Sequence, residues 1–387
     1  MKVCMLAHTS YEFDYRVRRY AEVLIEQGHE VDMFVLREKG QGYHEVINGV
    51  AVYRILEGDY RNEGLLSYFF GLLRFHIKSA AIIIKKHFID AYAVIHVHNF
   101  PDSLMFCAIL PKLLGAKIIL DIHDIMPEFI MSKFKKRKDS VLYGLLILVE
   151  KICALLSDHV IISNHLWHKV IVERSSRENK CTVIMNYPNT KIFCQRPKTN
   201  RDTKFIMLYP GTMNWHQGLD IAIHSFYLIK DQIPEAEFHI YGSGDQGESL
   251  AGLVSELGLA DRIFLNKSVP LNEIADIMAK ADIGIVPKRN DFFGGEAFST
   301  KILEFFAVGV PVVAARTRID QYYFDESNVM FFEPENTENL AQCLIELYKN
   351  SELRKSLVAH GREYVDENSW EVRKSTYIEI VNSLVKK

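Results

Sequence analysis

Short apolar runs alternate with helical patterns from one end of this chain to the other, and this order constrains its fold more than any other feature. Val3–Ala7 precedes an amphipathic stretch over Arg16–Gln27 that ends at Gly28, and the next apolar run is Val31–Leu36. Short continuous apolar runs are typical of strands that are buried on both faces of a parallel sheet. The strand-then-helix order therefore predicts an α/β protein with doubly wound parallel sheets.

The alternation pauses once, at the polar stretch 189–203. Further strands are expected before the pause at 93–97, 117–121, 159–162 and 182–185, and after it at 205–209, 237–241, 263–265, 283–286, 312–314 and 329–332. A chain of 387 residues is long for one core. We predict two Rossmann-like domains, 1–195 and 196–369, that face a central cleft, with a helix over about 370–387 that packs back on the first domain.

Composition limits the class of protein. The chain is 48% apolar and 25% charged, with a net charge of −3, so neither a disordered chain nor a nucleic-acid partner is expected. Its six cysteines show no metal-binding spacing, which is typical of core thiols in a reducing compartment. The chain begins with a strand rather than a leader, and it contains no run of about 18 uncharged apolar residues, so we do not expect a membrane-spanning helix. We expect a cytoplasmic protein.

One segment of the second half combines two carboxylates with a glycine loop and a helix start. Glu296 lies in the loop and Glu304 inside the expected helix, while Ser299 and Thr300 can cap the helix start. Free first-turn amides bind anions, and a cation such as Lys301 is disfavoured there unless an anion is bound. The segment predicts a site for a phosphorylated, hydroxyl-rich ligand; an ordinary cap on a solvated helix is the alternative.

Glycine-bearing loops follow three expected strands of the same half. Gly211 lies in the loop 209–220, Gly242 lies in the loop 240–245, and a third loop covers 266–270. Glycine allows backbone amides to come close to a diphosphate, although each loop alone is equally typical of a plain strand–helix turn. Because loops from several strand ends of one sheet share an edge, together they favour a nucleotide site.

These motifs together resemble those of the retaining GT-B glycosyltransferases of family 4, in a bacterial branch that builds surface polysaccharides. Glu296 and Glu304 fit the E-x7-E signature of that family. The resemblance spans nearly the whole chain and also rests on Gly211–Asp220, Gly242-Ser243-Gly244, Val269-Pro270-Leu271, Gly309-Val310-Pro311-Val312-Val313, Ser369-Trp370, Asp14-Tyr15-Arg16-Val17-Arg18-Arg19, Gly28-His29-Glu30-Val31, His96-Val97-His98 and 120–128.

The resemblance implies a retaining transferase that moves a sugar from a nucleotide-diphosphate donor, held by the C-terminal domain, to a glycan or lipid-linked acceptor. Glu304 would accept from the ribose hydroxyls, while His123 and Glu296 would be catalytic and contact the transferred sugar. The implied donor-binding residues are Gly211, Thr212, Asn214, Gln217, Gly242, Lys267, Ser268, Val269, Phe298, Ser299, Thr300, Lys301 and Glu304. For His123, a structural role is the alternative.

The chain departs from the family at Thr212 and Gln217, where Arg and Lys usually neutralise the diphosphate. We expect Lys301 and the helix N-terminus to take over, with Lys288 or Arg289 as further candidates. The acceptor or phosphate side is expected to hold Arg16, Arg18 and Asp124. Two other functions stay open: a nucleotide-sugar 2-epimerase with the same architecture, and a catalytically silent partner subunit.

The histidines give little indication of a metal. His96 and His98 are expected on alternate faces of their strand, so that at most one faces the cleft, and a zinc site lacks supporting cysteines. No DxD-type motif stands near a glycine loop. We therefore expect no cofactor and no metal requirement.

Two segments of the first half are both apolar and basic. Leu65–Phe88 carries four Lys and Arg side chains, and the basic run 133–138 precedes the apolar stretch Val141–Val149. Such helices are typical of docking on anionic lipid, and a solvated loop beside a core helix is the alternative. The expected partner is an anionic membrane surface, which would place the protein peripherally on the inner face of the membrane.

Overall fold

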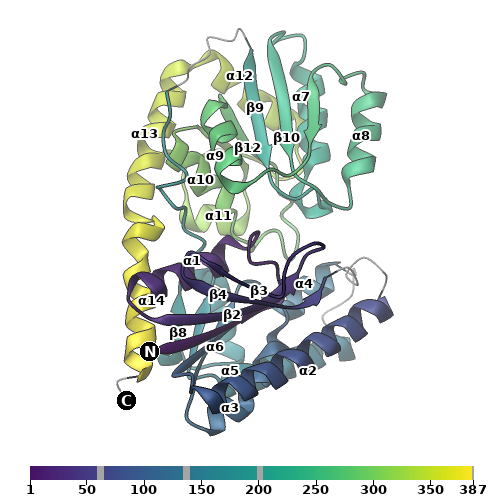
Figure 1. Ribbon diagram of the computed structural model, residues 1–387. Coiled ribbons are helices and arrows are strands. Elements are labelled where there is room, and N and C mark those ends of the chain that lie inside the picture. Colours follow the sequence, from purple (N-terminus) through teal and green to yellow (C-terminus); the bar gives the residue numbers. More distant parts are fainter. Residues whose placement is uncertain (59–64, 134–139, 198–203, 386–387) are drawn as a thin grey trace. The chain divides into compact units, whose positions relative to one another are not determined.

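The computed structural model of the chain describes residues 1–58, 65–133, 140–197 and 204–385. By their contacts the residues form two units, Met1–Asn186 with Lys374–Lys387 as the first and Tyr187–Arg373 as the second. Each unit is built on one mainly parallel sheet (Figure 1). The predicted fold class, mixed α/β with two parallel-sheet domains, is confirmed.

The sheet of the first unit has the strand order β3-β4-β2-β1-β5-β6-β7-β8, in which only β3 runs antiparallel to its neighbour. Its strands are β1 (Lys2–Ala7), β2 (Glu30–Arg37), β3 (His44–Ile47), β4 (Val50–Glu57), β5 (Val94–His98), β6 (Lys117–Ile122), β7 (His159–Ile162) and β8 (Cys181–Val183). The strand order reverses between β1 and β5. Doubly wound sheets bind their ligands at the carboxyl ends of the strands that flank such a point.

The helices of this unit connect its strands. They are α1 (Tyr15–Glu26), α2 (Leu65–Ile89), η2 (Asp102–Ala108), α3 (Ile109–Leu113), α4 (Met126–Lys133), α5 (Val141–Leu156), α6 (His165–Arg174) and η3 (Glu178–Lys180). Helix α1 begins because the Asp14 side chain accepts a hydrogen bond from the Val17 N–H, and it is followed by Gly28 at a φ of 76°. An aspartate at the N-cap and a glycine after the last turn are the usual helix limits.

The second unit has a six-stranded parallel sheet of order β11-β10-β9-β12-β13-β14. Its strands are β9 (Phe205–Pro210), β10 (Ala236–Tyr241), β11 (Ile263–Asn266), β12 (Ile283–Val286), β13 (Val312–Ala315) and β14 (Met330–Phe332). Its helices are η4 (Trp215–Gln217), α7 (Leu219–Ile229), α8 (Gly247–Glu256), α9 (Leu271–Lys280), α10 (Thr300–Val308), α11 (Arg318–Tyr323), α12 (Thr337–Lys349) and α13 (Ser351–Glu367). The strand order reverses here between β9 and β12.

The last helix, α14 (Trp370–Val385), starts with residues of the second unit and continues in the first. Contacts also place residues 187–195 in the second unit, whereas the predicted boundary falls after residue 195. The Trp370 N–H donates to the Pro188 carbonyl over 3.0 Å, and the Thr190 hydroxyl donates to Glu371 over 3.0 Å. These hydrogen bonds join the start of α14 to the segment that enters the second unit. From Lys374 onward α14 belongs to the first unit, where Tyr377 is buried.

Candidate active site

The second unit has a pocket at the carboxyl edge of its sheet, with a volume of about 380 Å³. Loops that follow β9, β10 and β11 line it together with the first turns of α10. It brings together eight of the residues that the resemblance implied for the donor: Gly211, Thr212, Gly242, Ser268, Val269, Thr300, Lys301 and Glu304. The carboxyl edge of a doubly wound sheet is the place where ligands of this fold bind.

The two glycine loops touch each other, and this contact explains why both carry glycine. A Cβ on Gly242 would lie 1.8 Å from the Gly211 carbonyl oxygen, and a Cβ on Gly211 would lie 2.3 Å from Cε of Lys301. The Gly211 and Gly242 amides donate to the carbonyls of Tyr241 and Asn266 over 2.8 and 3.0 Å. These two N–H groups therefore join neighbouring strand ends, and the glycines serve the close approach of the loops and of Lys301.

Helix α10 starts in this pocket without a side-chain cap. Ser299 occupies the N-cap position and is buried, but its side chain makes no capping hydrogen bond within the described structure. The hydroxyl of Thr300 instead hydrogen-bonds to Glu304. The cap expected from these two residues is thus not formed, and an uncapped helix N-terminus is a favourable site for an anion.

Lys301 and Glu304 are a charged pair in the first turns of α10, and both line the pocket. Burial lowers the pKa of the Lys301 amino group below its ordinary value, and the nearby Glu304 carboxyl opposes this shift only in part. Burial likewise raises the pKa of Glu304, against the effect of Lys301. The charged forms of Lys301 and Glu304 are therefore incompletely compensated by the protein, which favours a ligand that supplies an anion and hydroxyl donors.

Gln217 lies behind Lys301 and holds it in place. The Gln217 side-chain oxygen is 3.4 Å from the Lys301 amino group and accepts from the Tyr209 hydroxyl over 2.9 Å. The Lys301 amino group also lies 5.2 Å from the centre of the Tyr209 ring. Gln217 stands where the resemblance leads us to expect a cation. Its side-chain oxygen instead accepts from Lys301, a cation supplied by α10.

The structure places the other donor candidates and the catalytic candidate Glu296 outside the pocket lining. Those donor candidates are Asn214, Gln217, Lys267, Phe298 and Ser299. Asn214 precedes η4, and its carbonyl accepts from the Gln217 N–H over 3.0 Å. Phe298 packs against the rings of Tyr323 and Phe324. Lys267 is exposed on the loop after β11. The Glu296 carboxylate accepts from the Arg318 guanidinium over 2.5 Å.

Lys288 and Arg289, the further candidates for the diphosphate, are used within the fold. Lys288 is buried, pairs with Asp320 over 2.9 Å and donates to the Ala297 carbonyl over 2.8 Å. Arg289 donates to both carboxylate oxygens of Asp220 over 3.1 and 2.7 Å. Neither side chain lines the pocket, so Lys301 is the cation that the described residues present there.

The first unit has its own pocket, with a volume of about 310 Å³. Its lining comes from residues at the carboxyl ends of β1, β5 and β6 and includes two predicted residues, His123 and Asp124. Asp14, which caps α1, and Tyr68 of α2 also line it. The backbone N–H of His123 donates to the Asn99 side chain over 2.7 Å, which fixes the loop after β6 against the end of β5.

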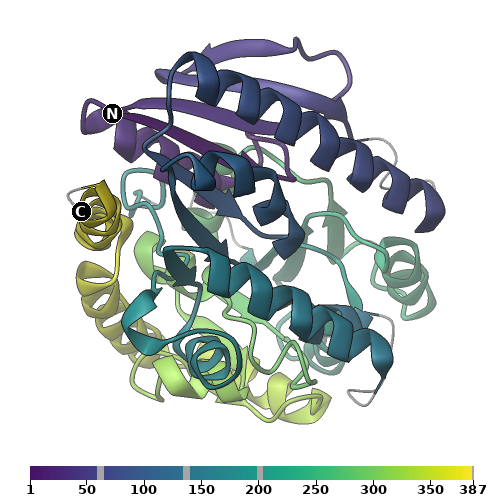
Figure 2. The same ribbon diagram turned by 90° about the horizontal axis from the view of Figure 1, so that it is seen from below.

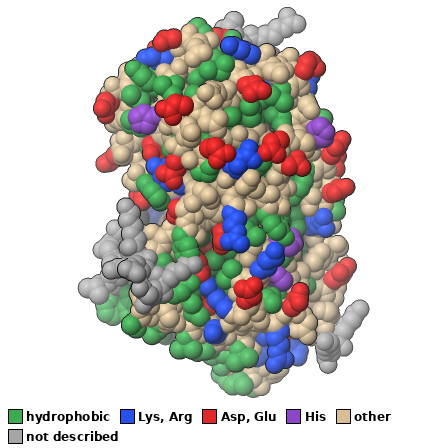
Figure 3. Space-filling model, turned by 180° about the vertical axis from the view of Figure 1, so that it is seen from behind, with side chains coloured by type: hydrophobic (Ala, Val, Ile, Leu, Met, Phe, Trp, Pro, Cys, Tyr) green, Lys and Arg blue, Asp and Glu red, His purple; other side chains and the backbone are tan. Residues whose placement is uncertain are grey.

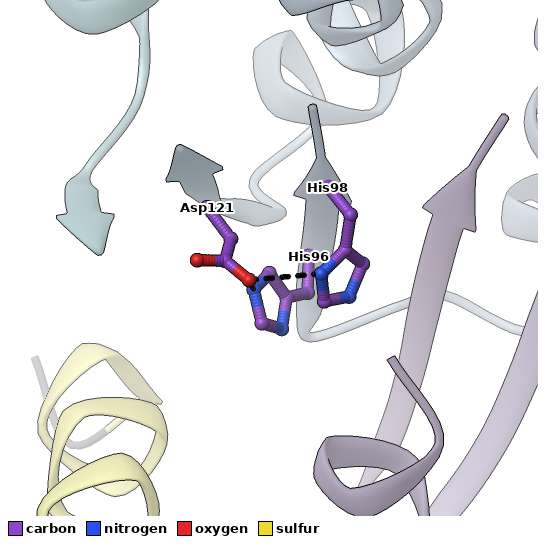
Figure 4. Close-up of side chains that lie close together, drawn as sticks. All are labelled: His96, His98 and Asp121. Carbon is purple, nitrogen blue, oxygen red and sulfur yellow. Dashed lines mark hydrogen bonds and ion pairs between the residues drawn. The ribbon is translucent and has the colours of Figure 1, made fainter. Parts of the chain in front are cut away.

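A buried carboxylate, Asp121 of β6, joins this pocket to a cluster of histidines and one arginine. Figure 4 shows Asp121 with two of the histidines, His96 and His98. Its two oxygens accept from the Arg16 guanidinium over 3.0 and 2.6 Å. One of them is also 2.8 Å from Nε2 of His123 and 3.0 Å from Nδ1 of His98. Although burial opposes ionisation, Arg16 and the histidines hold the pKa of Asp121 well below its ordinary value.

The ionised Asp121 fixes which nitrogen of His123 carries a proton. A carboxylate only accepts hydrogen bonds, so Nε2 of His123 must donate to it. Neutral His123 is then left with an acceptor at Nδ1. The carboxylate thus orients a histidine that borders the pocket and sets its tautomer.

Neither arginine that the sequence analysis assigned to the acceptor or phosphate side lines a described pocket. Arg16 is buried and, besides Asp121, donates to the Ile184 carbonyl over 2.8 Å and to Asn186 over 2.9 Å. Arg18 pairs with Glu22 one turn along α1 over 3.2 Å. The structure therefore gives Arg16 a place in the histidine cluster.

His96 and His98 face the same side of β5, and their rings lie 4.0 Å apart. The expectation that they alternate was wrong, because residues two apart in a strand point the same way. With Asp121 they offer three potential metal ligands within 4.8 Å of one another. However, Arg16 occupies both oxygens of Asp121, and its positive charge disfavours a cation there. The arrangement fits a hydrogen-bonded cluster.

Sequence reasoning missed Asp121 as the centre of this cluster and Tyr377 as its outermost member. Tyr377 of α14 lies 2.9 Å from Nδ1 of His96 and packs on the Tyr20 ring at 4.3 Å between centres. The pattern of alternate histidines on β5 beside an aspartate and a histidine on β6 was a usable signal, because His98 and Asp121 are in register in the sheet.

Two protein families match the chain, one for each half. Residues 14–187 match the family described as "Glycosyl transferase 4-like domain", and residues 192–364 match "Glycosyl transferases group 1". Among curated proteins, the uncharacterized glycosyltransferase MJ1607 of Methanocaldococcus jannaschii is 23% identical over 368 residues, which cover 91% of this chain and 89% of that protein. A second protein of that organism, the uncharacterized glycosyltransferase MJ1178, is 29% identical over 195 residues, which span 51% of its length.

Solved structures with the same fold cover nearly the whole chain. Sucrose-phosphate synthase from Thermosynechococcus elongatus superposes with a TM-score of 0.79 at 19% identity, over 99% of this chain and 98% of that one. HepE of Anabaena, solved with UDP and glucose, gives 0.75 at 14% identity, over 99% of this chain and all of that one. WaaG, a glycosyltransferase of lipopolysaccharide biosynthesis, gives 0.73 at 15% identity, over 97% and 99% of the two chains.

Proposed function

Because the chain belongs to the group 1 glycosyltransferases and has their GT-B fold, we propose that it moves a sugar from a nucleotide-diphosphate donor to a glycan or lipid-linked acceptor. We further propose that the transfer retains the anomeric configuration and serves the synthesis of a cell-surface polysaccharide in the cytoplasm. The observation that carries this proposal is the pocket of the second unit, where three strand-end loops meet a cation, a carboxylate and an uncapped helix start.

The donor fits this pocket by its chemistry. The diphosphate faces Lys301 and the N-terminus of α10, whose amides and dipole both favour an anion. The Glu304 carboxylate accepts from the vicinal hydroxyls of the ribose, a strong type of hydrogen bond because one partner is charged. Ser268 and Val269 lie beside the base. A ligand of this kind compensates the charges of Lys301 and Glu304 on α10, whose charged forms are disfavoured by burial.

The reaction requires no metal in this proposal. The acceptor oxygen forms a bond to the anomeric carbon while the bond from that carbon to the diphosphate oxygen breaks, and the acceptor proton passes to the leaving diphosphate. Lys301 and the helix N-terminus stabilise the negative charge that develops on the leaving group. The catalytic assignments are His123 in the first unit, whose ring Asp121 keeps in one tautomer and orientation, and Glu296 in the second unit, whose carboxylate accepts from Arg318.

A panel of donors tests the proposal and separates it from its alternatives. A thermal-shift screen with UDP, GDP, ADP and CMP first selects the base, since a ligand that binds the folded state raises the melting temperature. The matching nucleotide sugars are then incubated with the protein, and products are analysed by mass spectrometry and NMR. Slow release of the sugar with its anomeric configuration retained supports a transferase. An epimerised donor would identify a 2-epimerase.

A catalytically silent partner subunit is the second candidate, and the neutral side chains of Thr212 and Gln217 are the observation that favours it. Such a protein would bind no nucleotide, or would bind one without turning over any sugar donor. Glu304→Ala serves as the internal control for the nucleotide site. Unchanged affinity for the selected nucleoside diphosphate in that variant would refute the assignment of the ribose to Glu304.

A further inference from the structure

An apolar stripe runs along the outer face of α5. Val141, Leu145, Leu148, Ile152 and Leu155 recur at the spacing of one helical face, and all are exposed, Val141 by 86%. The acidic residue of this helix, Glu150, is buried and paired with Arg174. A solvent-facing stripe of this length is unusual, because amphipathic helices of globular proteins normally direct such a stripe toward the core.

A second stripe follows α2. Phe69, Leu73 and Ile77 lie one turn apart on its exposed face, and Arg74 and Lys78 are exposed beside them. The whole helix contains no acidic residue. By length and composition alone Ser67–Ile89 could cross a membrane, but its opposite face is buried in the first unit through Phe75, Ser79 and Ile83. The exposed face is therefore the part that needs an explanation.

The two stripes belong to one surface, because α2 and α5 both pack against η2. The segment η2–α3 between them adds exposed Phe106, Leu110, Leu113 and Leu114. Figure 2 shows α2 and α5 on either side of this segment, and Figure 3 shows hydrophobic side chains gathered over the lower end of the first unit. Large exposed apolar patches on soluble proteins mark interaction sites.

We propose that the outer faces of α2, η2–α3 and α5 dock the protein on an anionic lipid bilayer. Every exposed charged side chain on the described part of these elements is basic: Arg74, Lys78, Lys85 and Lys151. Apolar side chains that enter the acyl boundary and cations that face lipid phosphates are the two contributions that hold interfacial helices. A second copy of the chain fits less well, because a shared face would bring these four cations together.

This inference is independent of the proposed transfer reaction, since it rests on a surface and on no residue of the donor pocket. The basic run 133–138 includes Lys135, Lys136, Arg137 and Lys138. These four residues lie outside the described residues and form no part of the proposed surface. It depends on the described face of three neighbouring elements.

Flotation of the full chain with vesicles tests the proposal directly. The protein should float with vesicles of phosphatidylcholine that contain phosphatidylserine, and it should stay at the bottom with pure phosphatidylcholine. The variant Lys78→Gln/Lys85→Gln removes two positive charges and should lower the partitioning of the protein onto these vesicles by about 30-fold. Each lysine near an anionic surface contributes on the order of a few-fold to tenfold in affinity. The binding of the parent protein should also weaken as salt is raised.

The apolar stripe is tested by Leu145→Glu/Leu148→Glu, with Leu228→Glu as the matched control. Leu228 is an exposed leucine on α7 of the second unit, so its replacement adds a charge without touching the face. The α5 variant should lose flotation and keep the nucleotide-induced thermal shift, while the control keeps both. Equal flotation of the α5 variant overturns the proposal. So does a concentration-dependent dimer in light scattering that this variant abolishes, because that result identifies a second copy as the occupant.

Discussion

Lys301→Met is the most informative change to the donor pocket, because it removes one charge and keeps the unbranched shape and most of the length of the side chain. Lys301 is the cation that the described residues present to the pocket, and Thr212 beside it is neutral. If the diphosphate binds at this point, the variant loses a charge-assisted contact and leaves the walls of the pocket in place. The nucleoside part of the ligand keeps its contacts with Glu304 and with the loop after β11.

The expected loss follows from the partners that Lys301 has now. Its amino group lies 3.4 Å from the Gln217 side-chain oxygen and 5.2 Å from the centre of the Tyr209 ring, and the Glu304 carboxyl is a nearby opposite charge, so the diphosphate would add a direct anionic partner. Hydrogen bonds to charged groups are worth about 1.5–3 kcal/mol. That corresponds to roughly 10- to 150-fold weaker binding of the nucleoside diphosphate.

The same change should not destabilise the free protein. Burial lowers the pKa of Lys301, which means that the protein around it disfavours the ammonium form. Methionine has no such cost and is of similar shape, and the Glu304 carboxyl, whose pKa burial already raises, can take up a proton when the cation is removed. The melting temperature of Lys301→Met without ligand should therefore equal or exceed that of the parent protein.

The pH dependence of binding has a defined sign. A diphosphate favours charged Lys301, so affinity should fall as pH rises through the pKa of this group. Because that pKa is lowered from the ordinary value of 10.5, the fall should begin at lower pH than for an exposed lysine. The alkaline fall should be absent in Lys301→Met.

Isothermal titration calorimetry with the nucleoside diphosphate and with its nucleoside checks this reasoning. Lys280→Met, at the exposed end of α9, is the matched control and should bind both ligands as the parent protein does. Lys301→Met should weaken the diphosphate only. An equal loss for both ligands would mean that the pocket has deformed, and no loss for either would refute the placement of the diphosphate.

Three further predictions concern the same two pockets. Glu304→Gln should weaken the nucleoside and its diphosphate alike, by about tenfold, and calorimetry with both ligands distinguishes this pattern from that of Lys301→Met. Asp121→Asn leaves Arg16 buried without its ion pair and should lower the free energy of unfolding in urea by about 3–5 kcal/mol. The parent protein should lose stability as pH falls toward the lowered pKa of Asp121. If the variant loses stability at acid pH just as the parent protein does, the ion pair is contradicted. Gly242→Ala places a methyl group 1.8 Å from the Gly211 carbonyl and should abolish the nucleotide-induced thermal shift, whereas Gly252→Ala, where a Cβ meets nothing within 4 Å, should leave it unchanged.

The sequence predicted the parallel strands well because burial on both faces leaves a plain apolar run. It did not predict the β3–β4 hairpin. β4 is largely buried and parallel to β2, but polar residues interrupt its apolar run, Arg54 among them. β3 lies at the edge of the sheet with its side chains mostly exposed, so no apolar signal marks it. Edge strands owe their place to backbone pairing with a neighbour, which a local pattern does not record.

The donor pocket could be located in outline from the glycine loops and the two glutamates, but not in its details. The loop glycines were predicted to point amides at phosphate, while the structure uses the Gly211 and Gly242 amides between strand ends. Lys288 was a candidate by position along the chain and is instead buried against Asp320. These outcomes depend on contacts between residues that are distant in sequence, and spacing along the chain does not contain them.

The contact between Tyr377 and His96 has a consequence for the order in which the chain can fold during synthesis. Strand β5 emerges from the ribosome long before α14, yet His96 finds its hydroxyl partner only when the last helix has been made. Domains generally fold in the order of their synthesis, but here the first unit gains the contacts of residues 374–385 only after the whole second unit has been translated. A nascent chain released before Lys374 would leave Tyr20 and His96 uncovered, and a stop codon in that region would affect the N-terminal unit as directly as a mutation within it.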